Sequence, residues 1–135
     1  MQREVSEEDK AAAVAIKDEA NKHFLQKEYE KAIELYGQAL QKDHRNVQVL
    51  TNRAASLINL GDCEKALEDC KAARGVRLDW PKTFFREGEA YFQLKNYPDA
   101  AASFWEALRL EPTNKAYKTG FDKSVAAGKA FYGTK

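Results

Sequence analysis

Side chains that could do catalytic or metal chemistry are few in this sequence and stand at unsuitable spacings. His23 and His44 have no cysteine or carboxylate at metal-ligand spacing, so we interpret both as surface or packing residues. Cys63 and Cys70 fall on one expected helix about 10 Å apart, too far for a disulfide, and are interpreted as buried thiols. Glycines are scattered rather than gathered into a phosphate-binding loop. We therefore expect no enzymatic activity, no cofactor and no bound metal.

Composition favours a single domain with no bias toward nucleic acid or lipid. The chain has 135 residues, 44% hydrophobic and 32% charged, which is enough for one domain and too few for two. Lys and Arg total 22 against 21 acidic residues, so a general affinity for nucleic acid or membrane surfaces is not expected. No apolar run approaches the roughly 20 residues that span a bilayer, and residues 1–10 do not resemble a secretory leader. We expect a monomer in the cytoplasm, with the nucleus also possible.

The elements that must position any site come as a repeat. Three blocks, 13–46, 47–80 and 81–114, align without a gap and are each 34 residues long. Small residues let antiparallel helices approach closely, and a larger residue fills the space beside them. Both tryptophans, Trp80 and Trp105, are expected to pack at block junctions. Three positions of each block hold small residues: the eighth (Ala20, Ala54, Gly88), the twentieth (Ala32, Ala66, Ala100) and the twenty-seventh (Ala39, Ala73, Ala107). The twenty-fourth position holds a mostly larger residue: Tyr36, Cys70 or Phe104.

Each block is predicted to fold as two helices joined by a short turn, because its apolar residues recur at helical spacing. Gly61 is expected to stop a helix, and Asp62 and Asn96 to cap the helices that follow. Pro81 and Pro112 mark block ends, since proline can begin a helix but cannot continue one. No stretch alternates with period two, so we expect no strands.

Period, small residues and turns together resemble the tetratricopeptide repeat over residues 13–114. The resemblance implies an all-α fold: a right-handed superhelical solenoid of three helix-turn-helix repeats plus a C-terminal capping helix. Departures from the family pattern are modest. Two block ends lack the frequent proline, and near the block starts the frequent tryptophan is replaced by Ile16, Leu50 and Phe84.

Two segments lie outside the repeats. Residues 1–12 form an N-terminal extension, of which Met1–Asp9 is expected to be frayed. Domains of this kind are often appended to catalytic or targeting modules, so the sequence is compatible with a piece of a larger protein as well as with a separate domain. Residues 115–135 are interpreted as a capping helix and tail that seal the last repeat, because apolar residues follow one another at i, i+4 steps: Tyr117, Phe121 and Val125.

The resemblance also points to a binding site. In the family, the first helices of the repeats line a concave groove, and certain positions of each helix face it. In one subset these positions form a two-carboxylate clamp that holds the C-terminal Glu-Glu-Val-Asp tail of the 70-kDa and 90-kDa heat-shock chaperones. Lysine and arginine suit this task as charge-assisted donors to carboxylates, and asparagines add neutral amide donors. Five residues of this chain match the clamp pattern: Lys17, Asn21, Asn52, Lys82 and Arg86.

The clamp interpretation has to be weighed against simple exposure. Any single polar residue at a groove position is unremarkable, but five matches at about one chance in ten each arise about once in 10⁵ trials. Four more residues are expected to line the groove, namely Phe24, Ala55, Phe85 and Glu89, although ordinary packing explains the first three equally well. Glu89 would disfavour an acidic residue opposite it. We predict an adaptor that captures chaperone tails; the alternative is a scaffold that binds a different protein in its groove, with the five residues incidental.

Overall fold

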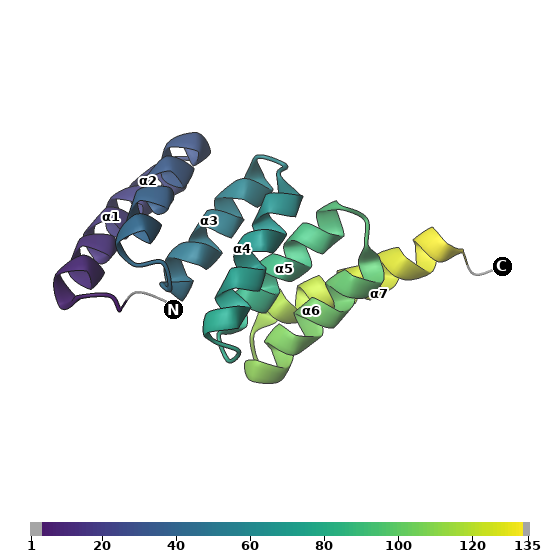
Figure 1. Cartoon of the computed structure of the whole chain (residues 1–135). Helices are drawn as coiled ribbons and strands as arrows, with labels where there is room; N and C mark the ends of the chain where they lie inside the picture. The colour runs from purple at the N-terminus through teal and green to yellow at the C-terminus, as the bar shows by residue number, and fades with distance from the viewer. Residues whose placement is uncertain (1–3, 134–135) are drawn as a thin grey trace.

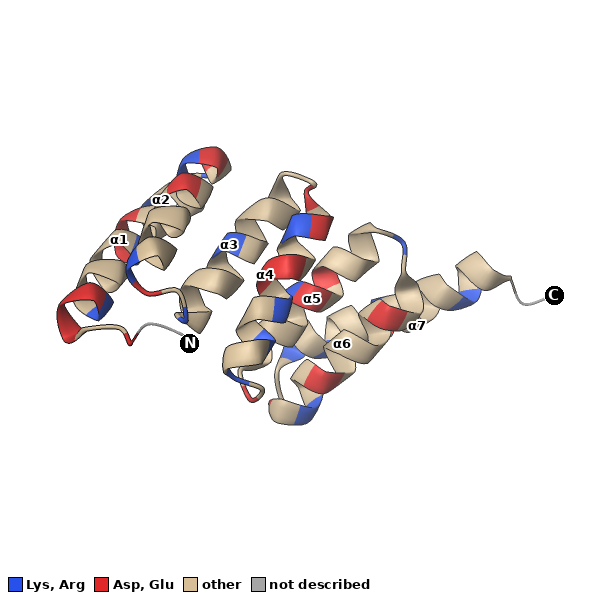
Figure 2. Cartoon of the chain, in the orientation of Figure 1, with Lys and Arg blue, Asp and Glu red and all other residues tan. Residues whose placement is uncertain are grey.

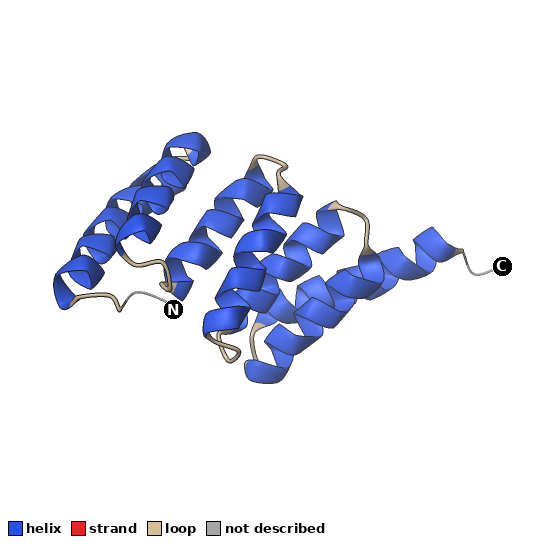
Figure 3. Cartoon of the chain, in the orientation of Figure 1, coloured by secondary structure: helices blue, strands red, loops and turns tan. Residues whose placement is uncertain are grey.

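The computed structural model describes residues 4–133, and within this range every regular element is an α-helix (Figure 3). Consecutive helices lie side by side and antiparallel, so that the chain forms an elongated stack (Figure 1). The predicted all-α solenoid with a C-terminal capping helix is confirmed. The described helices are α1 (Glu7–Leu25), α2 (Tyr29–Lys42), α3 (Val47–Asn59), α4 (Cys63–Val76), α5 (Pro81–Gln93), α6 (Tyr97–Leu110) and α7 (Lys115–Tyr132).

The turn inside each repeat has the same backbone conformation. Its middle residue is Lys27, Gly61 or Lys95, and the φ angles are 62°, 83° and 61° respectively. This left-handed region costs an L-residue energy but not a glycine, so Gly61 occupies its turn without strain. The expected helix stop at Gly61 is confirmed, and two lysines accept the same conformation at the equivalent positions.

Side chains cap four of the seven described helix starts, and one of the two predicted caps is absent. Asn96 accepts a hydrogen bond from the Asp99 backbone N–H at 3.4 Å, as predicted, whereas Asp62 makes no capping bond with its side chain. The Asp62 carboxylate lies 3.8 Å from the Lys65 amine instead, and it does not accept a hydrogen bond from the backbone N–H groups at the start of α4. Pro81 occupies the first turn of α5, as its fixed φ angle favours.

The first helix begins earlier than the sequence repeat does. Ser6 accepts a hydrogen bond from the Asp9 backbone N–H at 3.0 Å, and acidic residues fill the first turn from Glu7 onward (Figure 2). Negative charge at a helix N-terminus is favourable, so capping extends α1 outside the repeat. The expectation of fraying is therefore wrong for Glu7–Asp9, while residues 1–3 lie outside the described part of the chain.

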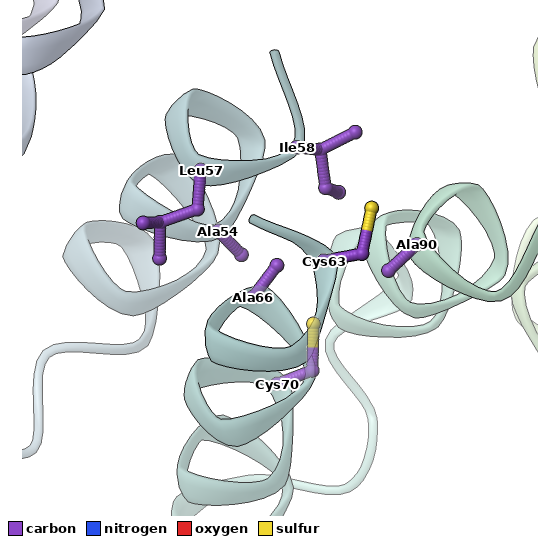
Figure 4. Packing of buried hydrophobic residues seen from close by; sticks show 7 residues of the cluster. All are labelled: Ala54, Leu57, Ile58, Cys63, Ala66, Cys70 and Ala90. Carbon is purple, nitrogen blue, oxygen red and sulfur yellow. The ribbon is translucent and has the colours of Figure 1, made fainter. Parts of the chain in front are cut away.

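The core is built from the residues that the repeat marked as small. The alanines at the eighth, twentieth and twenty-seventh positions are fully buried, and the larger residues Tyr36, Cys70 and Phe104 are at most 3% exposed. Around the middle repeat, Cys63 and Cys70 of α4 face Ile58 of α3 and Ala90 of α5 (Figure 4). The prediction that both thiols are buried is confirmed.

The stack is curved, and the helix contacts show in which direction. The first helices of the repeats touch each other, α1 with α3 and α3 with α5, and α5 also touches α7. The second helices α2, α4 and α6 contact only the helices next to them along the chain. Because only the first helices approach one another, they lie on the inner, concave side of the solenoid.

Two further expectations can be compared with the structure. Tyr117 of the capping helix is buried, and Phe121 and Val125 are half-buried, as their spacing predicted. Trp80 lies at the junction between α4 and α5, but Trp105 is 49% exposed on α6, so its prediction as a junction residue is wrong. None of the helices within residues 4–133 combines the length and the apolarity needed to cross a membrane.

Candidate functional site

A polar cleft of about 260 Å³ lies between the first helices of the three repeats. Its lining comes from α1, from α3 and from the start of α5, which the contacts between first helices bring together. No acidic side chain is among the lining residues, and two lysines are, so the cleft suits an anionic ligand. The lining residues are Lys17, Asn21, Gln48, Thr51, Asn52, Trp80 and Lys82.

The two asparagines of the cleft form one hydrogen-bonded unit. The Asn52 Nδ2 donates to the Asn21 Oδ1 at 3.1 Å, which joins α3 to α1. The hydroxyl of Tyr36, a buried residue of α2, donates to the same oxygen. Burial raises the pKa of Tyr36 to about 12, despite the opposing effects of the nearby Asn52 amide and the positive charge of Arg86. The phenol therefore stays protonated at neutral pH.

The two lysines of the cleft differ in their surroundings. Lys17 donates to the Gln48 side-chain oxygen at 2.9 Å, and its side chain is only 15% exposed. This bond holds the Lys17 amine between α1 and α3. Lys82 is exposed, and no carboxylate within residues 4–133 pairs with it. Its amine is therefore available to a ligand without breaking an existing ion pair.

Arg86 borders a second hollow, of about 400 Å³, which lies between α3, α5 and α7. Its guanidinium pairs with the Glu89 carboxylate at 2.9 Å and lies over the Phe85 ring at 5.1 Å from the ring centroid. Aromatic and charged side chains share the lining of this hollow, which consists of Ile58, Asn59, Phe85, Arg86, Glu89, Phe92, Gln93, Phe104, Ala116, Thr119, Gly120 and Lys123. The second hollow thus combines apolar surface with both signs of charge.

The structure sorts the sequence-predicted residues into three groups. Four of the five clamp residues line the polar cleft, and Arg86 lines the second hollow together with Phe85 and Glu89. Phe24 and Ala55 line neither hollow. Phe24 packs edge-on against Tyr29 in the first repeat at 5.5 Å between ring centroids, and Ala55 is buried. For these two residues, ordinary packing is the better interpretation.

Three cleft residues were not predicted as site residues from the sequence. Gln48 and Thr51 occupy groove-facing positions of the second repeat, so the repeat pattern that led to Asn52 could have found them. Trp80 ends the second block, where no helical periodicity points to the groove. The contact between α3 and the start of α5 brings it to the cleft.

Neither the histidines nor the cysteines are among the lining residues of the two hollows. His23 lies 2.7 Å from Glu28 and 3.8 Å from Glu19 in the first repeat, and His44 is exposed. Over residues 4–133, no group of three or more His, Cys, Asp or Glu side chains is placed to hold a metal ion. Burial raises the pKa of the Cys63 thiol, which lies 3.0 Å from the Gln93 side-chain oxygen.

Comparisons with known proteins agree with the repeat pattern. Models of the tetratricopeptide repeat match residues 20–61 and 81–114. The second tetratricopeptide domain of human RPAP3, solved in complex with the HSP70 peptide SGPTIEEVD, is 33% identical. Its TM-score is 0.78, and the match covers 83% of this chain and 93% of that domain. The chain belongs to the tetratricopeptide repeat family.

Other members of the tetratricopeptide repeat family are similar over most of this chain. The first such domain of Spaghetti (RPAP3), bound to the HSP90 peptide SRMEEVD, has a TM-score of 0.84 and 29% identity, covering 91% of this chain and 95% of that domain. The small glutamine-rich tetratricopeptide repeat-containing protein 2 of Mycosarcoma maydis is 32% identical over 119 residues, or 88% of this chain. The chain spans only 34% of that relative's length.

Proposed function

We propose that this tetratricopeptide domain binds the acidic C-terminal Glu-Glu-Val-Asp tail of the 70-kDa and 90-kDa heat-shock chaperones, as a co-chaperone or adaptor module. One observation carries the proposal: two lysines and two asparagines from three separate repeats converge on one cleft that no acidic residue lines. The domain works by binding alone and carries out no reaction. We place it in the cytoplasm.

The chemistry of the tail matches the chemistry of the cleft. A C-terminal aspartate carries two carboxylates on one residue, the side-chain group and the chain end. Lys17 and Lys82 supply the positive charge, and Asn21 and Asn52 supply amide donors. Charge-assisted hydrogen bonds of this kind contribute about 1.5–3 kcal/mol each, before the cost of ordering the peptide. We expect a micromolar dissociation constant, roughly −7 to −8 kcal/mol.

Two solved relatives support the assignment of the ligand. The human RPAP3 domain and the Spaghetti domain hold peptides that share the sequence EEVD at their C-termini and differ before it. The second hollow lies along α5 beyond the cleft, in the direction of Arg86 and Glu89. We propose that it takes the residues that precede EEVD, where an apolar side chain fits beside Phe85 and an acidic one meets Glu89.

The deciding experiment is calorimetric titration with a peptide that ends in Met-Glu-Glu-Val-Asp, beside the same peptide amidated at its C-terminus. Micromolar binding that amidation abolishes is the expected result, because amidation removes the chain-end carboxylate, one of the two on the terminal aspartate. Equal binding of both peptides would instead support the alternative, a scaffold that binds a different protein in its groove. Absence of binding to either peptide would refute the proposal.

A further inference from the structure

The oxygen of the Asn21 amide is fully occupied in the folded protein. An amide oxygen offers two lone pairs, and here one receives the Tyr36 hydroxyl and the other receives the Asn52 Nδ2. The only hydrogen-bonding groups that the Asn21 side chain has left are the two N–H groups of its amide. A carboxylate can only accept hydrogen bonds, so a cleft that binds one needs this amide in the donor orientation.

Packing alone does not explain why Tyr36 carries a hydroxyl. Tyr36 stands at the twenty-fourth position of the first repeat, and the equivalent residues are Cys70 and Phe104. All three are buried, so apolar bulk is sufficient at this position of the fold. A buried phenol needs a hydrogen-bond partner, since leaving it unpaired costs free energy. Its partner here is a cleft residue, which a phenylalanine could not orient.

We infer that Tyr36 is a positioning residue of the cleft, whose buried hydroxyl commits the Asn21 amide to donate its N–H groups to a bound carboxylate. This inference rests on the proposed function, which makes the ligand a carboxylate. Without the hydroxyl, Asn21 keeps only the bond from Asn52, and the amide can turn its oxygen toward the ligand. The two hydrogen bonds also polarise the amide, which strengthens its N–H donors.

The test is the variant Tyr36→Phe, titrated with the Met-Glu-Glu-Val-Asp peptide. Phe104 shows that a phenyl ring fits this repeat position, so the variant is expected to fold. We expect binding to weaken about 5- to 10-fold, the effect of losing one hydrogen bond to a buried group. The matched control is Tyr117→Phe, which removes another buried phenol hydroxyl outside both hollows and should leave affinity within about twofold.

A double-mutant cycle separates positioning from a general loss of structure. If Tyr36 acts through Asn21, then Tyr36→Phe should cause no further loss of affinity in a protein that already carries Asn21→Ala. Losses that add in full would show that the two residues act separately and would overturn the inference.

The side-chain amide signals of Asn21 and Asn52 provide a readout that needs no ligand. In nuclear magnetic resonance spectra of the unbound protein, Tyr36→Phe should shift the Asn21 amide signals, assigned by their loss in Asn21→Ala, while Tyr117→Phe should not. If the unmodified chain fails to bind the peptide but these signals shift, the proposed function fails and the positioning role stands. Unchanged Asn21 signals would overturn the positioning role whether or not the peptide binds.

Discussion

The five predicted clamp residues are not equally prepared to receive a ligand. Lys17 is bonded to Gln48 and Arg86 to Glu89, whereas Lys82 has no carboxylate partner within the described residues. A ligand carboxylate must compete with an existing partner at the first two positions and with water alone at Lys82.

Replacing Lys82 with alanine should cost about 2 kcal/mol of binding free energy, and Arg86→Ala a similar amount, because each removes one charged partner of the tail. Calorimetry with the Met-Glu-Glu-Val-Asp peptide measures both losses. Lys65→Ala is the control, since Lys65 is exposed on α4 and lines neither hollow. Losses below about 0.3 kcal/mol for both Lys82 and Arg86 would contradict the clamp.

Glu89 sets a different expectation, because its carboxylate already neutralises Arg86 at 2.9 Å. The variant Glu89→Gln keeps the shape of the side chain and removes the competing charge. This half-buried ion pair is worth on the order of 1 kcal/mol, so affinity for the acidic tail should rise by about two- to fivefold. Weaker binding in the same titration would mean that Glu89 holds Arg86 in place for the ligand rather than competing with it.

At the scale of helices, a single aromatic ring fixes how the last repeat meets the capping helix. The Phe104 ring of α6 lies against Gly88 of α5 and Gly120 of α7. A Cβ atom at Gly88 would come within 2.8 Å of this ring, and one at Gly120 within 2.6 Å. Glycine at these two positions lets α5 and α7 approach α6, and this approach forms part of the second hollow.

Gly120→Ala should therefore destabilise the domain by about 1–3 kcal/mol, the usual cost of overfilling a packed core. Gly75→Ala is the matched control, because Gly75 is an exposed residue of α4 and a Cβ there would meet nothing within 4 Å. This second change should stabilise the helix by about 0.5–1 kcal/mol. Urea unfolding of both variants provides the comparison, and equal stabilities would show that Phe104 can move aside.

At the scale of the whole molecule, charge is unevenly spread along the chain. Basic residues outnumber acidic ones 9 to 6 in residues 81–135, although the net charge of the chain is only +1. The positive excess lies in the half that contains Lys82 and Arg86. This excess should attract an acidic peptide at long range, and added salt should screen that attraction.

Raising the salt concentration from 0.05 to 0.5 M should weaken tail binding roughly 10-fold, mainly by slowing association. Stopped-flow mixing with a labelled Met-Glu-Glu-Val-Asp peptide separates the two rate constants. The Lys82→Ala variant should show a shallower dependence on salt, as one cation is missing. An affinity independent of salt would contradict electrostatic capture.

Two buried tyrosines should limit stability in alkali. Burial raises the pKa of both Tyr36 and Tyr117 from 10.0 to about 12. Above pH 10 the unfolded chain loses these protons while the folded chain keeps them, so ionisation favours unfolding. The stabilisation is thus complete below pH 10 and is lost as the pH rises to about 12. Melting temperatures from pH 9 to 12 should fall less steeply for a variant with Tyr36→Phe and Tyr117→Phe together.

The sequence by itself determined the repeat, the turns and the buried alanines, because in a solenoid each helix contacts mainly its neighbours along the chain. The same period placed Lys17, Asn21, Asn52 and Lys82 on successive first helices, and so in one cleft. The early start of α1 could have been read from Ser6 and the acidic residues after it.

Only the tertiary structure decided how side chains from different helices meet. It paired Lys17 with Gln48, left Trp105 exposed and brought the Tyr36 hydroxyl to Asn21. A repeat pattern specifies which face of a helix a residue occupies, but not the rotamer it adopts or the distance to a side chain on the next helix. These depend on how closely the helices pack, which every residue of the interface sets together.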